Sequence, residues 1–205
     1  VYNGVGDHFR PVPVSETAEF AAKHQLPEAF VLILGNTDPK KNTEGMLRAL
    51  DIAEKKHGFT PTLVMLDLDR AYLQSLLDKI GNPNLGGRIR LTGYLPNREL
   101  PLLMNRATIY VYPSLRESFG IPPLEAMGCG LPVIASNTSS MPEVCGDAAL
   151  SIDPFQPETI ADAMFKLWND DDLKQTLRTK GLERIKQFSW DQMAQRMLAI
   201  YERQR

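Results

Sequence analysis

The sequence predicts an α/β domain with a parallel β-sheet of about six strands, helices on both faces of the sheet, and further helices after it. Short apolar runs alternate with helical patterns between residues 30 and 152, as in repeated strand–helix–strand units. The runs are mostly continuous rather than alternating, which is typical of strands buried on both faces. Residues 158–203 contain helical patterns only. Such a Rossmann-like sheet places its ligand crevice at the carboxyl ends of the strands, so the site is expected in the loops that follow them.

Six short runs rich in apolar residues predict the strands, at 30–34, 62–66, 88–92, 108–112, 132–135 and 149–152. Gly35 ends the first run, since glycine favours turns over strand interiors. Apolar residues three or four positions apart predict the helices, over 43–57, 71–80, 98–106, 122–127, 158–168, 171–186 and 190–203. The fourth of these begins with two prolines, which a first helical turn accepts. The last has a capping signal, with Ser189 followed by Gln192 three residues on.

The composition excludes several classes of protein. The chain has 205 residues, 43% hydrophobic and 23% charged, as in an ordinary globular domain. Its net charge of -2 disfavours a nucleic-acid binder, which is usually strongly basic. The longest apolar runs are far short of the roughly 20 residues of a membrane-spanning helix. No signal peptide is recognised at the start, and Cys129 and Cys145 are expected to be reduced and buried, so we expect a cytoplasmic protein.

One domain is expected, preceded by a connecting segment. Residues 1–14 contain two glycines and two prolines and begin as if in mid-protein, so they are interpreted as a linker or as the tail of a preceding domain. Residues 15–205 are then a single domain, long enough to bury its own core.

Two glutamates follow the fourth predicted strand. Glu117 lies in the loop and Glu125 early in the next helix, with seven residues between them. Helix rise and chain reach allow the two carboxylates to lie on one rim of the crevice, roughly 10 Å apart. Between them lie the backbone amides of Ser118, Phe119 and Gly120, and a helix N-terminus, which attracts an anion such as a phosphate. A ligand with a hydroxylated ring at each end and phosphates between them fits this pattern, which describes a nucleotide sugar.

Other patterns carry less weight. The glycines around Cys129 follow a helix rather than a strand, the wrong order for a dinucleotide-binding loop. The three histidines have no partner at metal-ligand spacing, and no metal site is expected. Residues 170–172 are three aspartates between two helices, which indicates a helix cap. Trp168 and Trp190 fall on apolar helix stripes and are expected in the core.

Several short motifs, in order along nearly the whole chain, resemble one family. The most specific is the segment from Glu117 to Met127, and the weaker ones are Asn3-Gly4-Val5, residues 38–42, Gly93-Tyr94-Leu95-Pro96 and Phe188-Ser189-Trp190. Together they are similar to the nucleotide-binding C-terminal domain of retaining glycosyltransferases of the GT-B fold, in glycosyltransferase family 4 of the "group 1" type. The loop at 39–42 and the segment at 121–123 favour the mannosyltransferase-like members.

The resemblance implies a role for each matching residue. Glu117 would be catalytic and, with the amides of Ser118, Phe119 and Gly120, would hold the donor sugar. Glu125 would accept hydrogen bonds from the ribose hydroxyls. Lys41, and beside it Lys40, would bind the diphosphate, and Lys41 would also assist catalysis. The turn at Tyr94 and Leu95 would hold the base.

This chain departs from the family pattern at two positions. Asn36 and Lys40 stand where many members have arginine, and lysine lacks the bidentate fork of arginine.

The resemblance implies a hexosyltransferase that uses a GDP- or UDP-linked sugar and needs neither cofactor nor metal. Its partner would be an N-terminal acceptor-binding domain of the same protein, so the chain alone is expected to bind donor without transferring sugar. Peripheral association with a membrane stays open. The alternative is a nucleotide-binding or scaffolding module of the same fold without activity, since fold alone does not establish function.

Overall fold

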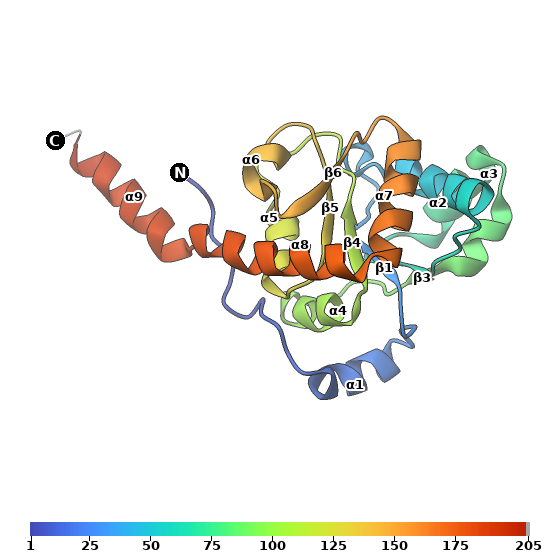
Figure 1. Ribbon diagram of the computed structural model, residues 1–205, viewed down its shortest axis with the longest axis horizontal. Helices are drawn as coiled ribbons and strands as arrows, with labels where there is room; N and C mark the ends of the chain where they lie inside the picture. The colour runs from blue at the N-terminus through green and yellow to red at the C-terminus, as the bar shows by residue number, and fades with distance from the viewer. Residues whose placement is uncertain (204–205) are drawn as a thin grey trace.

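A computed structural model describes residues 1–203 of the chain; the last two residues of the predicted domain lie outside this range. Its centre is a single parallel sheet (Figure 1). The strands are β1 (Val31–Ile33), β2 (Leu63–Met65), β3 (Ile89–Leu91), β4 (Ile109–Tyr112), β5 (Val133–Ser136) and β6 (Ala149–Ile152). Their order across the sheet is β3-β2-β1-β4-β5-β6, and every pairing is parallel. The predicted fold class and all six predicted strands are confirmed.

The strand order reverses in the middle of the sheet. Leu32 of β1 pairs with Val64 of β2 on one side and with Tyr110 of β4 on the other. The chain continues from β1 into a helix on one face and from β4 into a helix on the opposite face. The ligand crevice expected of an open α/β sheet therefore falls at the carboxyl edge between these two loops.

Two hydrophobic layers cover the sheet. Ile33 of β1 lies in the core beneath α2, α3 and α7, while Leu32 points into the core beneath α1, α4, α5 and α6. The helices of the first layer are α2 (Thr43–His57), α3 (Arg70–Ile80) and α7 (Pro157–Asn169). Those of the second are α1 (Val14–Lys23), α4 (Leu100–Arg106), α5 (Ile121–Gly128) and α6 (Met141–Cys145). Cys129 and Cys145 are unpaired and buried in the second layer, as predicted.

Two helices were not predicted. In α1 the buried residues Thr17, Phe20 and Ala21 follow the three-and-four spacing of a helix, but they come directly after the proline-rich segment. The helix α6 has five residues, which is too short to show a helical period. Both lie in the second layer, and α6 follows the crevice side of β5.

The helices α8 (Asp171–Arg184) and α9 (Trp190–Glu202) complete the chain, and α9 projects away from the sheet (Figure 1). Ser189 caps α9 as predicted, accepting a hydrogen bond from the Gln192 amide. No residue of α9 is buried, and Leu198 and Tyr201 are 59% and 64% exposed. The apolar side chains of α9 are therefore largely exposed.

The prediction for Trp190 is wrong, because the side chain is 48% exposed at the point where α9 leaves the domain. The apolar stripe on which that prediction rested belongs to a helix of which no residue is buried against the rest of residues 1–203. Trp168, in contrast, packs against the first core layer.

Residues 1–13 contain no helix or strand, yet they lie against the domain. Val5 and Phe9 are buried, and the Val5 amide donates to the Phe188 carbonyl at 3.0 Å. Asn105 of α4 bonds to the backbone of Arg10 and Val12. Whether this segment links two domains stays a prediction. Among residues 1–203 no helix combines the length and apolar character needed to cross a membrane.

Candidate functional site

The loops after β1 and β4 are joined at the carboxyl edge of the sheet. The short 3₁₀ turn Pro39–Lys41 follows β1, and the carbonyl of Lys40 accepts a hydrogen bond from the Leu115 amide (2.7 Å) and lies 2.9 Å from the Ser114 hydroxyl oxygen. These contacts fix the loop that carries Lys41 against the loop that carries Glu117. Two candidate residues that are 76 positions apart in sequence thereby become neighbours.

Lys41 and Glu117 form an ion pair. The Lys41 Nζ lies 2.6 Å from Glu117 Oε1, and their side chains are only 18% and 12% exposed. The same oxygen accepts hydrogen bonds from Tyr112 (2.8 Å) and Ser114 (2.7 Å). Burial alone would raise the pKa of Glu117, but the bonds from Lys41, Ser114 and Tyr112 outweigh it and hold the pKa below its usual range. Glu117 is therefore an anion whose second oxygen, Oε2, has no hydrogen-bond donor within residues 1–203.

Lys40 lies differently from its neighbour. Its ammonium pairs with Asp38 at 3.0 Å, and its side chain is 51% exposed. Only its backbone carbonyl contributes to the loop contact described above. The structure therefore directs Lys41 into the crevice and Lys40 onto the surface.

Asn42 holds three loops together. It has a left-handed backbone (φ 58°, ψ 38°), which asparagine tolerates better than most residues. Its Nδ2 donates to the carbonyl of Pro113 at 3.1 Å and to that of Pro154 at 2.7 Å. These carbonyls belong to the loops after β4 and β6, so one side chain ties both loops to the turn that carries Lys41.

We expect Asn42→Asp to destabilise the protein by about 2–3 kcal/mol, because it removes both donors and sets a carboxylate against two carbonyl oxygens. Asn42→Gly keeps the left-handed backbone at no steric cost and is expected to lose less. Urea denaturation of the two variants checks this order. A variant Asn42→Asp as stable as the parent would show that the two bonds contribute nothing.

Glu125 is half-buried in α5 and has no hydrogen-bond or ion-pair partner among residues 1–203. Burial raises the pKa of its carboxyl to about 7. Gly120 precedes the helix in a left-handed conformation (φ 89°) and packs against Met141, so a side chain there would collide with that residue. Glu125 is the fifth of the eight residues of α5, and a carboxylate without partners is equipped to accept hydrogen bonds from a ligand.

The loop between the two glutamates is fixed through its carbonyls. The Ser140 hydroxyl donates to the carbonyl of Phe119 (2.9 Å) and lies 3.2 Å from the carbonyl oxygen of Glu117. The backbone amides of Ser118, Phe119 and Gly120 make no hydrogen bond within residues 1–203. Ser118 is exposed, and the Phe119 ring packs among other aromatic rings. The amides expected to bind an anion are therefore unoccupied donors.

The turn expected to hold the base lies after β3. Gly93 adopts a left-handed conformation (φ 70°), Tyr94 is 77% exposed and Leu95 is 5% exposed. Leu95 belongs to the second core layer, so it supports the turn, and its neighbour Tyr94 presents an open aromatic face.

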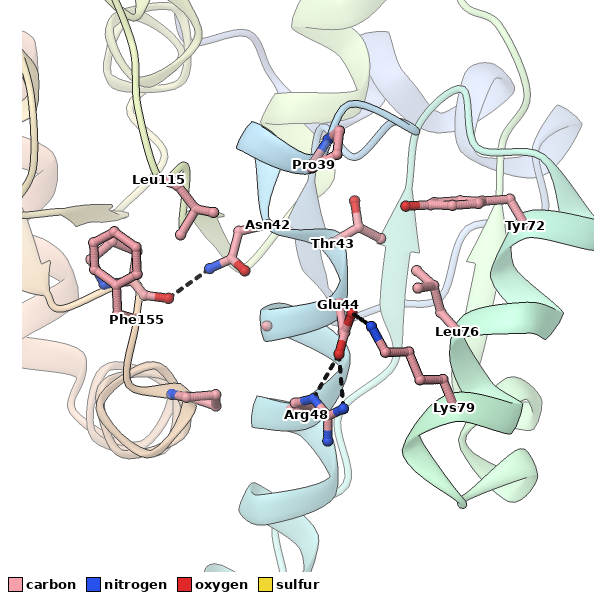
Figure 2. Close-up of a pocket in the computed structure, with 13 residues that line it drawn as sticks. Pro39, Asn42, Thr43, Glu44, Arg48, Tyr72, Leu76, Lys79, Leu115 and Phe155 are labelled. Atoms are coloured by element: carbon pink, nitrogen blue, oxygen red, sulfur yellow. Dashed lines mark hydrogen bonds and ion pairs between the residues drawn. The ribbon is translucent and has the colours of Figure 1, made fainter.

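A hollow of about 620 Å³ adjoins the site on the outer side of α2 (Figure 2). Asn42, Leu115 and Phe155 line one side of it, and Tyr72 and Lys79 line the other. Neither Glu117 nor Glu125 lines this hollow. Its charged residues are satisfied among themselves, because Glu44 binds both Arg48 and Lys79 (Figure 2).

No group of three or more potential metal-ligating side chains occurs in the part of the chain that the structure describes. Asp170 caps α8 by accepting from the Leu173 amide at 2.8 Å, as predicted. The contacts that Tyr112, Ser114 and Asn42 make at the site were not predicted from the sequence. The position of these residues was the available signal, since each lies within two residues of the end of an element at the carboxyl edge.

Known proteins are similar to this chain in sequence and in fold. The family model for glycosyl transferases group 1 matches residues 14–184. An O-antigen chain mannosyltransferase B of Escherichia coli is 33% identical over 193 residues, which are 94% of this chain and 51% of that protein. A D-inositol 3-phosphate glycosyltransferase of Corynebacterium jeikeium is 34% identical, over 94% of this chain and 49% of that protein. This chain therefore spans about half the length of these relatives.

Solved structures of other proteins contain the same fold. A sucrose-phosphate synthase of Thermosynechococcus elongatus superposes on 98% of this chain and 51% of its own, with a TM-score of 0.81 and 27% identity. The Anabaena protein HepE, in complex with UDP and glucose, superposes with a TM-score of 0.84 at 19% identity, over 98% of this chain and 56% of its own. These neighbours are GT-B glycosyltransferases. This chain belongs to the glycosyl transferases group 1 family, and its fold is one half of the GT-B architecture.

Proposed function

We propose that this chain is the donor-binding half of a retaining glycosyltransferase that moves a hexose from a nucleoside diphosphate sugar to an acceptor hydroxyl. The observation that carries the proposal is the buried Lys41–Glu117 ion pair at the carboxyl edge of the sheet. It places a cation and an anion beside three unoccupied backbone amides, and Glu125 follows on the next helix.

Each group has a part in this proposal. Lys41 donates to Glu117 and Tyr112 and retains a third N–H for a phosphate oxygen. Glu117 offers Oε2 to hydroxyls of the sugar. The amides before α5 and the N-terminus of that helix add positive potential for the diphosphate. Glu125 accepts hydrogen bonds from the ribose hydroxyls, which a carboxylate does strongly.

The departing diphosphate is stabilised by Lys41 and the helix N-terminus, which supply positive charge where negative charge develops. We therefore expect no requirement for a divalent metal. No side chain is assigned as a nucleophile for a double displacement, so we propose that the acceptor hydroxyl attacks on the face from which the diphosphate leaves and gives its proton to an oxygen of the departing diphosphate. This route keeps the anomeric configuration.

The relatives favour mannose as the sugar, because the Escherichia coli proteins are named mannosyltransferases. The base is expected to be uracil or guanine: HepE was solved with UDP. The acceptor is expected on an N-terminal domain of the same protein, since this chain spans only half of its relatives. We propose that the enzyme acts in the cytoplasm, with peripheral contact to a membrane left open.

Calorimetric titration of the chain with UDP, GDP and the corresponding hexose conjugates tests the proposal. Binding of one diphosphate, without release of diphosphate from the conjugate, is expected from the isolated chain. Absence of binding by all four ligands would contradict the proposal. Binding by a full-length protein that transfers no sugar would favour the non-catalytic nucleotide-binding module.

We expect Glu117→Gln to weaken binding of the nucleotide sugar more than binding of the diphosphate alone. Affinity for the nucleotide sugar should fall about tenfold, because the hydroxyls lose a charge-assisted acceptor. Affinity for the diphosphate alone should change by less than about threefold, since Lys41 stays in place. The same titrations measure both, and an equal loss for the two ligands would place Glu117 at the phosphates.

A further inference from the structure

Strand β4 places two tyrosines on the same face of the sheet. Tyr110 and Tyr112 are 0% and 2% exposed, and their rings stack with centroids 6.0 Å apart. The two hydroxyls differ in their hydrogen-bond partners. The Tyr112 hydroxyl contacts both members of the ion pair, whereas the Tyr110 hydroxyl is buried without a hydrogen-bond partner among residues 1–203.

The Tyr112 hydroxyl closes a triangle with the ion pair. Lys41 Nζ donates to it at 2.9 Å, and it donates to Glu117 Oε1 at 2.8 Å, while Lys41 and Glu117 are 2.6 Å apart. A hydroxyl is suited to this position because it accepts from an ammonium and donates to a carboxylate at the same time. Burial and the contact with Glu117 raise the pKa of Tyr112, so the hydroxyl keeps the proton that it donates.

The ring of Tyr112 gives the triangle a rigid base. It is packed in the second core layer, and the Lys41 ammonium lies 5.1 Å from its centroid. A lysine side chain otherwise has many rotamers, and ordering it costs conformational entropy. Here the hydroxyl, held by a packed ring, defines where the ammonium lies.

We propose that Tyr112 is a positioning residue that holds Lys41 and Glu117 in one fixed arrangement, so that the phosphate and the sugar of the donor are bound by a single coupled unit. Tyr112 itself touches neither part of the donor. The inference rests on the proposed function for the identity of the ligand, but the arrangement of the ion pair is a property of the protein alone.

The matched pair Tyr112→Phe and Tyr110→Phe tests this, because each variant deletes one hydroxyl from the same face of the same strand. For Tyr112→Phe we expect about a tenfold loss of affinity for the diphosphate, since a hydrogen bond to a charged group is lost. The affinity for the nucleoside without phosphates should not change. The nucleotide sugar should lose more than the diphosphate, because Glu117 also shifts. Tyr110→Phe should bind all three ligands like the parent.

A ligand-free measurement keeps the inference separate from the proposed function. In ¹⁵N spectra of the lysine ammonium groups, the Lys41 signal should be protected from hydrogen exchange in the parent and in Tyr110→Phe, and lose protection in Tyr112→Phe. An unprotected Lys41 signal in the parent, or equal protection in Tyr112→Phe, would overturn the inference.

The titrations distinguish a failure of the proposed function from a failure of the inference about Tyr112. If the parent binds none of the ligands, the proposed function fails and the spectra still decide the inference. If the parent binds and Tyr112→Phe binds equally well, or loses nucleoside and diphosphate affinity alike, the inference fails and the proposed function stands.

Discussion

Replacing Glu125 with glutamine is expected to weaken nucleoside diphosphate binding about ten- to a hundredfold. In the proposed complex the carboxylate accepts from the ribose hydroxyls, and a charge-assisted hydrogen bond contributes about 1.5–3 kcal/mol. The amide of glutamine has the same shape but only one accepting oxygen and no charge. Titration with UDP and GDP measures the loss, and unchanged affinity in the folded variant would remove Glu125 from the site.

The pH dependence of ligand affinity, compared between the parent and Glu125→Gln, is a sharper test. The pKa of Glu125 is about 7 in the folded protein, against an ordinary value of 4.5. Ligand affinity should therefore rise as pH passes through about 7, where half of the accepting carboxylate has formed, and level off roughly one pH unit above that. In Glu125→Gln this rise should vanish. A parent protein whose affinity is flat between pH 5.5 and pH 8, a range bracketing that pKa, would contradict the assignment.

Stability should respond in the opposite direction. Below pH 4.5 the carboxyl is protonated in both the folded and the unfolded chain, and it carries no penalty. As pH rises from 4.5 to about 7, the unfolded chain ionises while the folded chain still holds its proton, so stability is lost until the folded carboxyl ionises as well. The loss is at most about 3 kcal/mol for a shift of this size. Glu125→Gln should thus unfold at a higher temperature than the parent at pH 8, and the difference should shrink at pH 5.

The fold was largely predictable because its signals are local. The helix α2 begins and ends where the sequence predicts, at Thr43 and His57, since the apolar spacing at Met46, Leu47 and Leu50 is unbroken. Gly58 ends it in a left-handed conformation (φ 62°). The short helix α6 carries no such signal, and its place is set by packing against the sheet.

The site was predictable only in part, because its contacts join distant segments. The positions of Glu117 and Glu125 follow from strand ends and spacing. The contact between Lys41 and Glu117 depends on β1 lying beside β4, which no local pattern encodes. Lys40 and Lys41 are adjacent and chemically identical, and only the 3₁₀ turn that holds them decides which one faces the crevice. The sequence predicted Tyr112 as a buried strand residue, which is correct, but nothing in the local pattern predicted its contacts with Lys41 and Glu117.

This difference between adjacent lysines gives the site its strongest test. Lys41→Ala is expected to lower diphosphate affinity about a hundredfold, against at most about threefold for Lys40→Ala, whose exposed charge is screened by water and salt. The large loss has two sources. The phosphates lose a donor, and the Glu117 carboxylate, left without its cation, repels the diphosphate. The unpaired carboxylate also lowers the stability of the free protein, by about 2–5 kcal/mol for such truncations.

The double variant Lys41→Ala, Glu117→Ala separates these two sources. Removing Glu117 in the Lys41→Ala background deletes the unpaired charge, so part of the lost affinity and stability should return. The parent, the two single variants and the double variant are compared by urea denaturation and by titration with UDP and GDP. Strictly additive losses would mean that Lys41 and Glu117 act independently, which their 2.6 Å contact does not allow if it persists in solution. A recovery in the double variant would show that the buried pair works as one unit, and that donor binding depends on its cation being present to balance the carboxylate that faces the sugar.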